Sequence, residues 1–426
     1  IFSVCWPMYA AMPAVLKNAM LQAYEVCGWN LETSENEYNK NLFPTFQDLL
    51  TELVDVIEHS AYDKEVKNNY RGSLETRVRS LANGLNGQIF SADEIPEKQL
   101  FDENTIVDLS RVGSLESKSL IMGILIMRLN EYRMTSCTEM NNPLKHVTVL
   151  EEAHNILRRT SMEQTEEGSN VAGKSVEMIA NAIAEMRTYG EGFVIADQSP
   201  GAVDISAIRN TNTKIIMRLP DEQDRQLAGK AAALKDDQLD EIARLPKGVA
   251  VIYQNNWTEP VLCKINKFEG EEKRYQYKTC ATDRKAEMMS AILLRNLLKK
   301  EKGEPLDLNL RQLQDLLLKV SMPSKTKIAA LKALQKNGRC RQKDIQSVVY
   351  KLVCTPKVEE ELTHTESIEE WRDEIAYFGS TGLADLDEEM LNEVAELILL
   401  EQIKRYDWPK TYLEQWQEFR KKEMLV

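Results

Sequence analysis

The sequence predicts an α/β fold, in which a mostly parallel β-sheet carries helices on both faces and is flanked by helical regions. Between about residues 104 and 266, short apolar runs rich in β-branched residues alternate with helical patterns, an order typical of parallel sheets covered by helices. From about 8 to 100 and beyond about 270, apolar residues instead recur at helical spacing. Parallel sheets bind ligands beyond the carboxyl ends of their strands, so residues that follow strands are candidate site residues.

These patterns divide the chain into four expected segments. They are an N-terminal strand with a helical insertion at 1–103, an α/β core at 104–268, a linker helix at 269–300 and an α-helical C-terminal domain at 301–426. In the insertion, TFQDLLTELVDVIEHS predicts a helix with a one-faced apolar stripe of Phe46, Leu49, Leu50, Leu53, Val56 and Ile57.

In the core, we expect two helices in SKSLIMGILIMRLNEYR and SVEMIANAIAEMRTYG. The expected strands are NTIVDLS, HVTVLEE, GFVIADQ, NTKIIMRL, GVAVIYQ and EPVLCKI. In the C-terminal domain, SKTKIAALKALQKNG predicts a helix with Ser324 as its N-cap and Asn337-Gly338 as its stop signal.

Composition excludes several protein classes. The chain has 426 residues, of which 43% are apolar and 28% charged, as in ordinary globular proteins. Its net charge of −13 argues against general electrostatic adhesion to nucleic acid or acidic membranes, although local basic patches can still bind phosphate. Seven cysteines without a CxxC spacing predict reduced thiols and a cytoplasmic location. The densest apolar run, LIMGILIM, is too short to span a bilayer, so no membrane partner is expected.

GSNVAGKS, from Gly168 to Ser175, fits the pattern of a phosphate-binding loop. Such a loop needs a strand before it and a helix after it. The helix is expected, but RRTSMEQTEE precedes the match, and its Glu163, Glu166 and Glu167 would repel a polyphosphate. We therefore interpret the match as a coincidence at the entry of a core helix.

HVTVLEEAH offers a better candidate, because an apolar strand there ends in Glu151 and Glu152. Paired carboxylates at a strand end suit Walker B chemistry, in which one acid holds the water shell of Mg²⁺ and the next polarises the attacking water. The alternative is a helix over HNILRR whose first turn is acidic. Two neighbouring features favour the site: Gln198 follows the next strand, and Arg209, Arg218 and Arg225 lie close to strand ends.

Together these residues resemble the HerA branch of the HerA–FtsK ATPases, which are hexameric RecA-like motors. The resemblance rests on IVDLSRVGSLESKSLIMGIL, VTVLEEAHNIL, AEMRTYGEGFVIADQSP, NTNTKIIMRLPDEQD and LPKGVAVIYQ, in the family's order, and on the opening CWPMYAAMPAVLKNAM. It covers roughly the first two-thirds of the chain. In the family the phosphate loop precedes these motifs, so we expect this chain, which begins IFSVCWPMY, to be part of a longer gene product.

The resemblance implies a role for each matching residue. Glu151 would orient the Mg²⁺ shell, Glu152 would be the general base, and Gln198 would sense the γ-phosphate of ATP. Arg187, Arg209 and Arg218 are candidates for contacting phosphate across a subunit boundary, with a structural salt bridge as the alternative for each. His154 is expected to orient or pack rather than to transfer protons.

The function implied is that of an ATP-driven hexameric ring that translocates duplex DNA and works with a nuclease or another effector, in DNA processing or anti-phage defence. Two alternatives stay open: a non-hydrolysing ring scaffold that organises an effector, and a motor of the conjugation or secretion type.

Three C-terminal features remain. SKTKIAALKALQKNGRCRQK concentrates basic residues, which predicts either a solvated face or a contact with DNA or a partner. The stretch from Val358 to Glu393 is acidic and could meet a basic neighbour. Trp408, Tyr412 and Trp416 have a spacing that suits core packing or an interface.

Overall fold

The computed structural model describes residues 1–137, 139, 141–159, 171–270, 282–354, 356–365, 367–382, 386–406 and 411–423. The chain divides into two compact units. Unit 1 comprises Ile1–Pro13 and Ile95–Tyr275, and unit 2 comprises Ala14–Glu94 and Gln276–Val426. The helical region at 14–94 thus groups with the C-terminal helices, which differs from the segment boundaries expected from the sequence.

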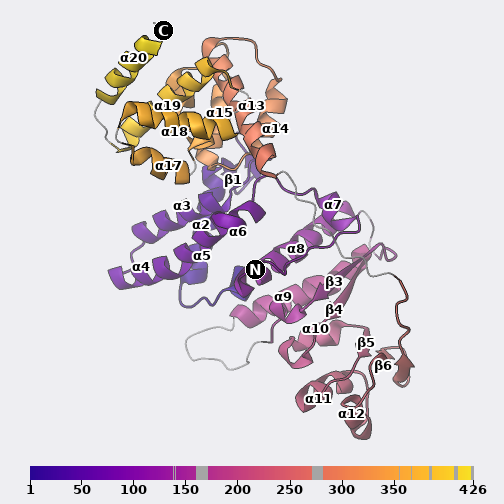
Figure 1. The fold of residues 1–426 in the computed structure, drawn as a ribbon. Coiled ribbons are helices and arrows are strands. Elements are labelled where there is room, and N and C mark those ends of the chain that lie inside the picture. Colours follow the sequence, from indigo (N-terminus) through magenta and orange to yellow (C-terminus); the bar gives the residue numbers. More distant parts are fainter. Residues whose placement is uncertain are drawn as a thin grey trace. The chain divides into compact units, whose positions relative to one another are not determined.

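Unit 1 holds the α/β part of the chain (Figure 1). Its strands are β3 (His146–Glu151), β4 (Glu191–Ala196), β5 (Thr213–Ile216), β6 (Val249–Gln254) and β7 (Val261–Lys264). Its helices are α1 (Phe2–Cys5), α7 (Glu97–Phe101), α8 (Leu115–Ser136), α9 (Val171–Met186), α10 (Ile205–Asn210), α11 (Glu222–Ala231) and α12 (Asp236–Ile242). Short 3₁₀ turns are η2 (Ala153–Asn155), η3 (Arg187–Tyr189) and η4 (Pro200–Ala202).

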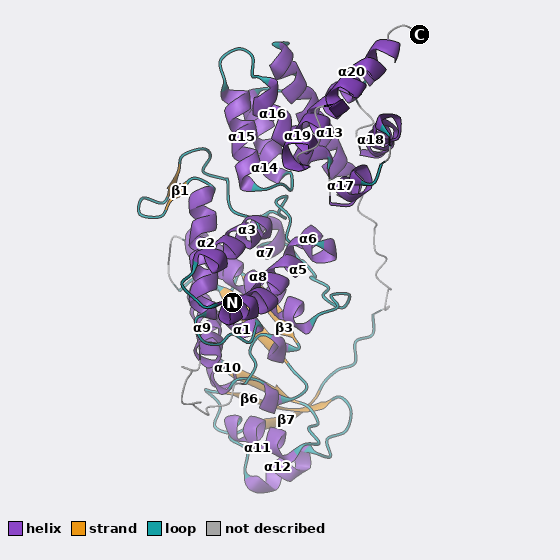
Figure 2. Cartoon of the chain, turned by 90° about the vertical axis from the view of Figure 1, so that its left-hand side faces the viewer, coloured by secondary structure: helices purple, strands orange, loops and turns teal. Residues whose placement is uncertain are grey.

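The expected α/β class is confirmed, and the strands form two separate groups (Figure 2). β3 and β4 pair in parallel, from His146 opposite Glu191 to Glu151 opposite Ala196. β5, β6 and β7 pair antiparallel in chain order, whereas the sequence predicted a mostly parallel arrangement. Short connections such as the one between β6 and β7 allow antiparallel neighbours, since parallel strands need a longer crossover.

Two expected strands are wrong. NTIVDLS is extended but has no strand partner among the described residues, and Ile106 is 91% exposed. The expected N-terminal strand is instead the short helix α1, which packs against α8 and α9. The apolar character of both segments suggested strands, but a strand also needs a hydrogen-bonding partner, which the local sequence does not specify.

Helices α8 and α9 position the β3–β4 pair. α9 buries Val176, Ile179, Ile183 and Met186 on one face, and each such side chain stabilises the fold by roughly 1.5–3 kcal/mol. Leu150 of β3 joins the same core. The opposite sheet face is less covered in the described part of the chain, because three valines remain about half exposed: Val147, Val149 and Val194.

Unit 2 is helical apart from a two-stranded ribbon of β1 (Trp29–Asn30) and β2 (Glu35–Asn36). Its first helices are α2 (Met12–Val26), α3 (Phe46–His59), α4 (Lys64–Tyr70), α5 (Thr76–Ala82) and α6 (Gly84–Ile89), with a short π-helix η1 (Arg71–Glu75). Its C-terminal helices are α13 (Thr282–Lys302), α14 (Leu310–Lys319), α15 (Ser324–Gln335), α16 (Gln342–Val353), α17 (Pro356–Thr363), α18 (Ile368–Gly382), α19 (Glu388–Tyr406) and α20 (Thr411–Glu423). No helix of the described chain is both long and apolar enough to cross a bilayer.

The aromatic residues near the C-terminus pack in the core of unit 2. Trp416 is fully buried, and its ring meets that of Trp371 edge to face at 6.0 Å. Tyr412 is partly exposed, and Trp408 lies outside the described residues. Core packing is therefore the correct interpretation for Trp416.

A buried carboxylate joins two helices that are far apart in sequence. Asp48 near the start of α3 is 4% exposed and accepts hydrogen bonds from the amide and hydroxyl of Ser324 at 2.7 Å each. It also accepts from the amide of Thr45 at 2.8 Å. Ser324 is the first residue of α15 rather than its N-cap, which is Pro323. The expected N-cap was wrong because the hydroxyl of Ser324 is used to hold α3.

We expect Asp48→Ala to lower the free energy of unfolding by about 2–4 kcal/mol, because it leaves several buried donors without an acceptor. Urea titration followed by circular dichroism measures the change. Asp55→Ala is the matched control, since Asp55 is an exposed carboxylate on the same helix. Equal stability of the two variants would contradict this role of Asp48.

Candidate functional site

The parallel register brings the carboxyl ends of β3 and β4 to one edge. Glu151 ends β3 opposite Ala196, the last residue of β4. The next residues, Glu152 on one side and Asp197 and Gln198 on the other, therefore share this edge. Polar groups at the carboxyl ends of adjacent parallel strands occupy the usual ligand-binding position of α/β folds.

Glu152 has an unusual backbone conformation. Its φ and ψ are 51° and 49°, in the left-handed region, where a residue with a β-carbon pays of order 1 kcal/mol. The chain then makes only the 3₁₀ turn η2 and no α-helix over HNILRR. The alternative of an acidic first turn of a helix is therefore wrong, and the strain is concentrated at the residue predicted to be the base.

The structure brings Glu152 and Gln198 together, as expected for a shared site. The Gln198 amide Nε2 donates a hydrogen bond to Glu152 Oε1 at 2.9 Å. Both side chains are exposed at the edge. The other carboxylate oxygen, Oε2, lies 3.7 Å from His154 Nδ1. Glu151 is also exposed, and strand alternation places it on the same sheet face as Val147 and Val149.

Asp197 is a site residue that the sequence reasoning missed. Its Oδ2 accepts hydrogen bonds from the His154 amide at 2.8 Å and lies 2.9 Å from His154 Nδ1. Its Oδ1 accepts from the Ser199 amide at 3.0 Å. Burial alone would raise the pKa of Asp197, but the hydrogen bonds from Ser199 and His154 hold it below its usual value. Asp197 thus fixes His154 beside Glu152, in the orienting role expected for that histidine.

A second missed residue, Asp224, holds the loop that carries Gln198. Asp224 is 8% exposed on α11, and it accepts hydrogen bonds from the Ser199 hydroxyl at 3.0 Å and the Gly201 amide at 2.6 Å. Asp224 lies in the segment NTNTKIIMRLPDEQD, which supports the family resemblance but implied no role for this aspartate. Nothing local in the sequence indicates that this aspartate bonds a loop some 23 residues earlier.

The candidate arginines lie in three places. Arg187 begins η3 after α9, Arg209 is near the end of α10, and Arg218 follows β5. All three are exposed, and none forms an ion pair within the described residues, so the salt-bridge alternative finds no partner there. Arg225 instead donates to the carbonyl oxygens of Leu219 and Pro220. The phosphate-loop pattern is divided: residues 168–170 lie outside the described residues, and Val171–Ser175 form the start of α9.

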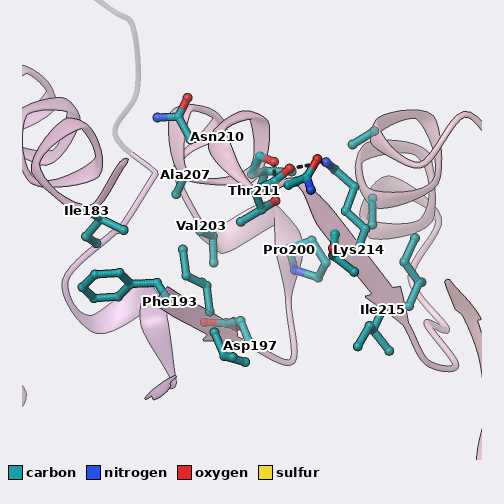
Figure 3. A pocket seen from close by; sticks show the side chains of 18 of the residues that line it. Ile183, Phe193, Asp197, Pro200, Val203, Ala207, Asn210, Thr211, Lys214 and Ile215 are labelled. Carbon is teal, nitrogen blue, oxygen red and sulfur yellow. Dashed lines mark hydrogen bonds between the residues drawn. The ribbon is translucent and has the colours of Figure 1, made fainter. Parts of the chain in front are cut away.

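A slot of about 1060 Å³ separates β4 from β5 (Figure 3). Its lining includes five consecutive residues of the β4 strand, Glu191 to Ile195, and five consecutive residues from Thr213 to Met217. Successive strand residues point to opposite faces, so the slot runs along the two strand edges rather than over one face. Asp197, Gln198, Arg187 and Arg218 also line it, which connects this β4–β5 slot to the carboxylate edge.

Comparison with known proteins gives partial sequence matches. The chain is 24% identical over 246 residues to the DNA double-strand break repair helicase HerA of Sulfurisphaera tokodaii, covering 57% of this chain and 46% of that protein. It is 26% identical over 170 residues to the HerA helicase of Sulfolobus acidocaldarius, covering 39% and 32%. The chain is thus related to the HerA-type ATPases of the HerA–FtsK superfamily.

Other comparisons add less. No protein-family model matches the chain. The solved structure of VirB4 from Thermoanaerobacter pseudethanolicus aligns at 13% identity with a TM-score of 0.42, over 63% of this chain and 67% of that one. The chain spans less than half the length of the curated HerA relatives named above.

The hydrogen bonds of Asp197 predict a pH dependence of stability. A lowered pKa means that ionised Asp197 stabilises the fold fully above its unfolded-state pKa of about 4, and that this contribution is lost as pH falls through the folded-state value. We expect Asp197→Asn to lower the free energy of unfolding at pH 7 by about 1–3 kcal/mol, and by less near pH 3. Urea titrations at both pH values measure this, with the exposed Asp240→Asn as control. An effect of Asp197→Asn on the free energy of unfolding that is the same at both pH values would contradict the assignment.

Proposed function

We propose that this chain provides the catalytic carboxylates of an ATP-hydrolysing site in a HerA-type motor that acts on duplex DNA. The observation that carries the proposal is the hydrogen-bonded pair of Glu152 and Gln198 at the ends of two adjacent parallel strands. The left-handed backbone of Glu152 supports it, because strained residues persist where function requires their placement. The HerA relatives named above supply the family context.

In this site the residues have separate roles. The Gln198 amide holds Glu152 by Oε1, which leaves Oε2 available to take a proton from an attacking water. His154, held by Asp197, lies beside that oxygen and orients it. In the proposal, Gln198 would sense the γ-phosphate of ATP, and Glu151 would hold the water shell of Mg²⁺.

The donor set fits Mg²⁺ bound together with a nucleotide. The described residues contain no cluster of three or more His, Cys, Asp and Glu side chains that could cage a metal by themselves. Mg²⁺ in ATPases needs no such cage, since it is held by one or two carboxylates, water and substrate phosphates. When bound, Mg²⁺ with ATP supplies the phosphoryl group and neutralises its developing charge.

The β4–β5 slot is shaped for a strand that brings the phosphate-binding turn. A strand residue with its side chain fills roughly 160 Å³ of a packed sheet, from the spacings within and between sheets. The slot of about 1060 Å³ is thus large enough for a short strand. A strand seated there would end beside Gln198 and Arg218, and its following turn would face Glu152.

Assembly completes the proposal. Arg187, Arg209 and Arg218 are exposed cations, and one of them would contact the phosphates bound by a neighbouring copy in a ring, which we take to be hexameric. An arginine acting across the boundary would make hydrolysis depend on assembly. A nuclease or another effector as partner, a role in anti-phage defence and a cytoplasmic location are further parts of the proposal that rest on the sequence resemblance and the cysteine pattern.

We expect Glu152→Gln in the full-length protein to lower DNA-stimulated ATP turnover by about 10²–10⁴-fold, because the amide cannot accept the proton of water. Glu152→Gly separates catalysis from strain: it removes the base and relieves the left-handed backbone, so turnover should fall while the melting temperature stays equal or rises. Glu185→Gln, an exposed carboxylate on α9, is the matched control. Unchanged turnover in Glu152→Gln would contradict the assignment of Glu152 as the general base. Absence of turnover in the unaltered protein would favour a non-hydrolysing scaffold.

The arginines are tested one at a time by Arg187→Ala, Arg209→Ala and Arg218→Ala. The residue acting across the boundary should lose about 10³-fold or more in turnover while keeping ATP binding, measured by a fluorescent nucleotide. Full turnover in all three variants would show that none of these three arginines acts across the boundary.

A further inference from the structure

The most basic segment of the chain lies in unit 2, far in sequence from the proposed catalytic edge. Residues 324–343 contain seven lysines and arginines and no aspartate or glutamate, in a chain whose net charge is −13. One of the seven, Lys327, is 2% exposed and donates to the Leu318 carbonyl at 2.7 Å. It belongs to the helical core, and the remaining six need another explanation.

Three of these cations form a line along α15. Lys325, Lys332 and Lys336 are spaced by seven and four residues, which at 100° per residue places them within about 40° of one another around the helix. At 1.5 Å per residue the line is roughly 17 Å long. Lys325 lies 3.2 Å from Glu52, and Lys332 lies 4.7 Å from the centre of the Tyr38 ring, yet both stay exposed.

The line continues into the turn between α15 and α16. Lys336 Nζ bonds Asp344 Oδ2 at 2.6 Å, which joins the end of α15 to the start of α16. Arg341 Nε lies 3.6 Å from the same oxygen. The Lys336 ammonium and the Arg341 amide lower the pKa of Asp344 to about 2, so this carboxylate stays ionised at neutral pH.

Arg339 and Lys343 then remain as cations without a carboxylate. Both are exposed, and neither forms an ion pair within the part of the chain that the structure describes. The backbone of this turn is held in place, because the Cys340 amide donates to the Lys300 carbonyl at 3.3 Å and Lys300 Nζ donates to the Lys336 carbonyl at 2.8 Å. The positive groups are therefore presented by an ordered framework.

We infer that this surface, the basic stripe of Lys325, Lys332, Lys336, Arg339, Arg341 and Lys343, binds the phosphate backbone of duplex DNA. Its roughly 17 Å helical part spans about five phosphates of one strand, at 3.4 Å per phosphate along the duplex axis. Six cations within twenty consecutive residues, in a protein whose net charge is −13, favour a polyanion that offers regularly spaced charges. The inferred contacts are to phosphate oxygens, which carry no sequence information, so we expect binding to be independent of sequence.

This contact is separate from ATP hydrolysis, and the test omits nucleotide. Fluorescence anisotropy of the chain with a labelled duplex of about 20 base pairs, over a range of salt concentrations, gives the affinity and its salt slope. We expect Arg339→Ala/Arg341→Ala/Lys343→Ala to weaken binding roughly tenfold or more at low salt and to reduce the slope of log K against log salt by about 2–3. Lys343→Ala alone should reduce the slope by about 1.

The matched control is Lys17→Ala/Lys40→Ala/Lys64→Ala, which removes the same charge from exposed lysines of the same unit. Loss of affinity in the stripe variant with the control unchanged supports the inference. Equal loss in both variants would reduce the effect to net charge and overturn it, as would unchanged binding in the stripe variant. Equal competition by polyglutamate, or tighter binding of duplex RNA, would overturn the assignment to DNA. Lys343→Ala keeps the test decisive if the triple variant does not fold.

Discussion

The register of β3 and β4 depends on one buried carboxylate. The Glu191 side chain is fully buried, and it binds Arg133 of α8 at 2.9 Å together with His146 at 2.8 Å and Thr148 at 2.7 Å on the neighbouring strand. Leaving this charge unpaired in the interior would cost several kcal/mol. A slip by one residue would break these bonds and turn Glu151 to the opposite face. The bonds of Glu191 at the amino end of the strands thus fix which residues lie side by side at the carboxyl end, some six residues away.

The sequence allowed the prediction of what depends on local pattern. The periodicity of α8, α9 and β3–β4 predicted these elements and the meeting of Glu152 with Gln198, since parallel strands bring their carboxyl ends to one edge. It could not predict the roles of Asp197 and Asp224, because these roles depend on hydrogen bonds to residues distant in sequence. Asp197 bonds His154, and Asp224 bonds the loop at Ser199. The same limit explains the errors at residues 104–110 and at Ser324, where a distant or absent partner overrides the local preference.

The two proposed surfaces follow different physical rules. The carboxylate edge is acidic and strained, and in the proposed site its exposed residues would be completed by a nucleotide and by a strand in the β4–β5 slot. The basic stripe is unstrained, and its cations project from ordinary helix and turn positions. A motor of the proposed kind needs both properties, since hydrolysis requires exact placement of few groups, whereas holding a duplex requires many weak and salt-sensitive contacts.

The most direct test of the account is a structure of the full-length protein with Mg²⁺ and a non-hydrolysable ATP analogue. The account predicts the γ-phosphate within hydrogen-bonding distance of the Gln198 amide, with a Mg²⁺-bound water on Glu151 and a strand seated between β4 and β5. A nucleotide bound instead at Gly168–Ser175, with the edge formed by Glu151, Glu152 and Gln198 left in solvent, would contradict it.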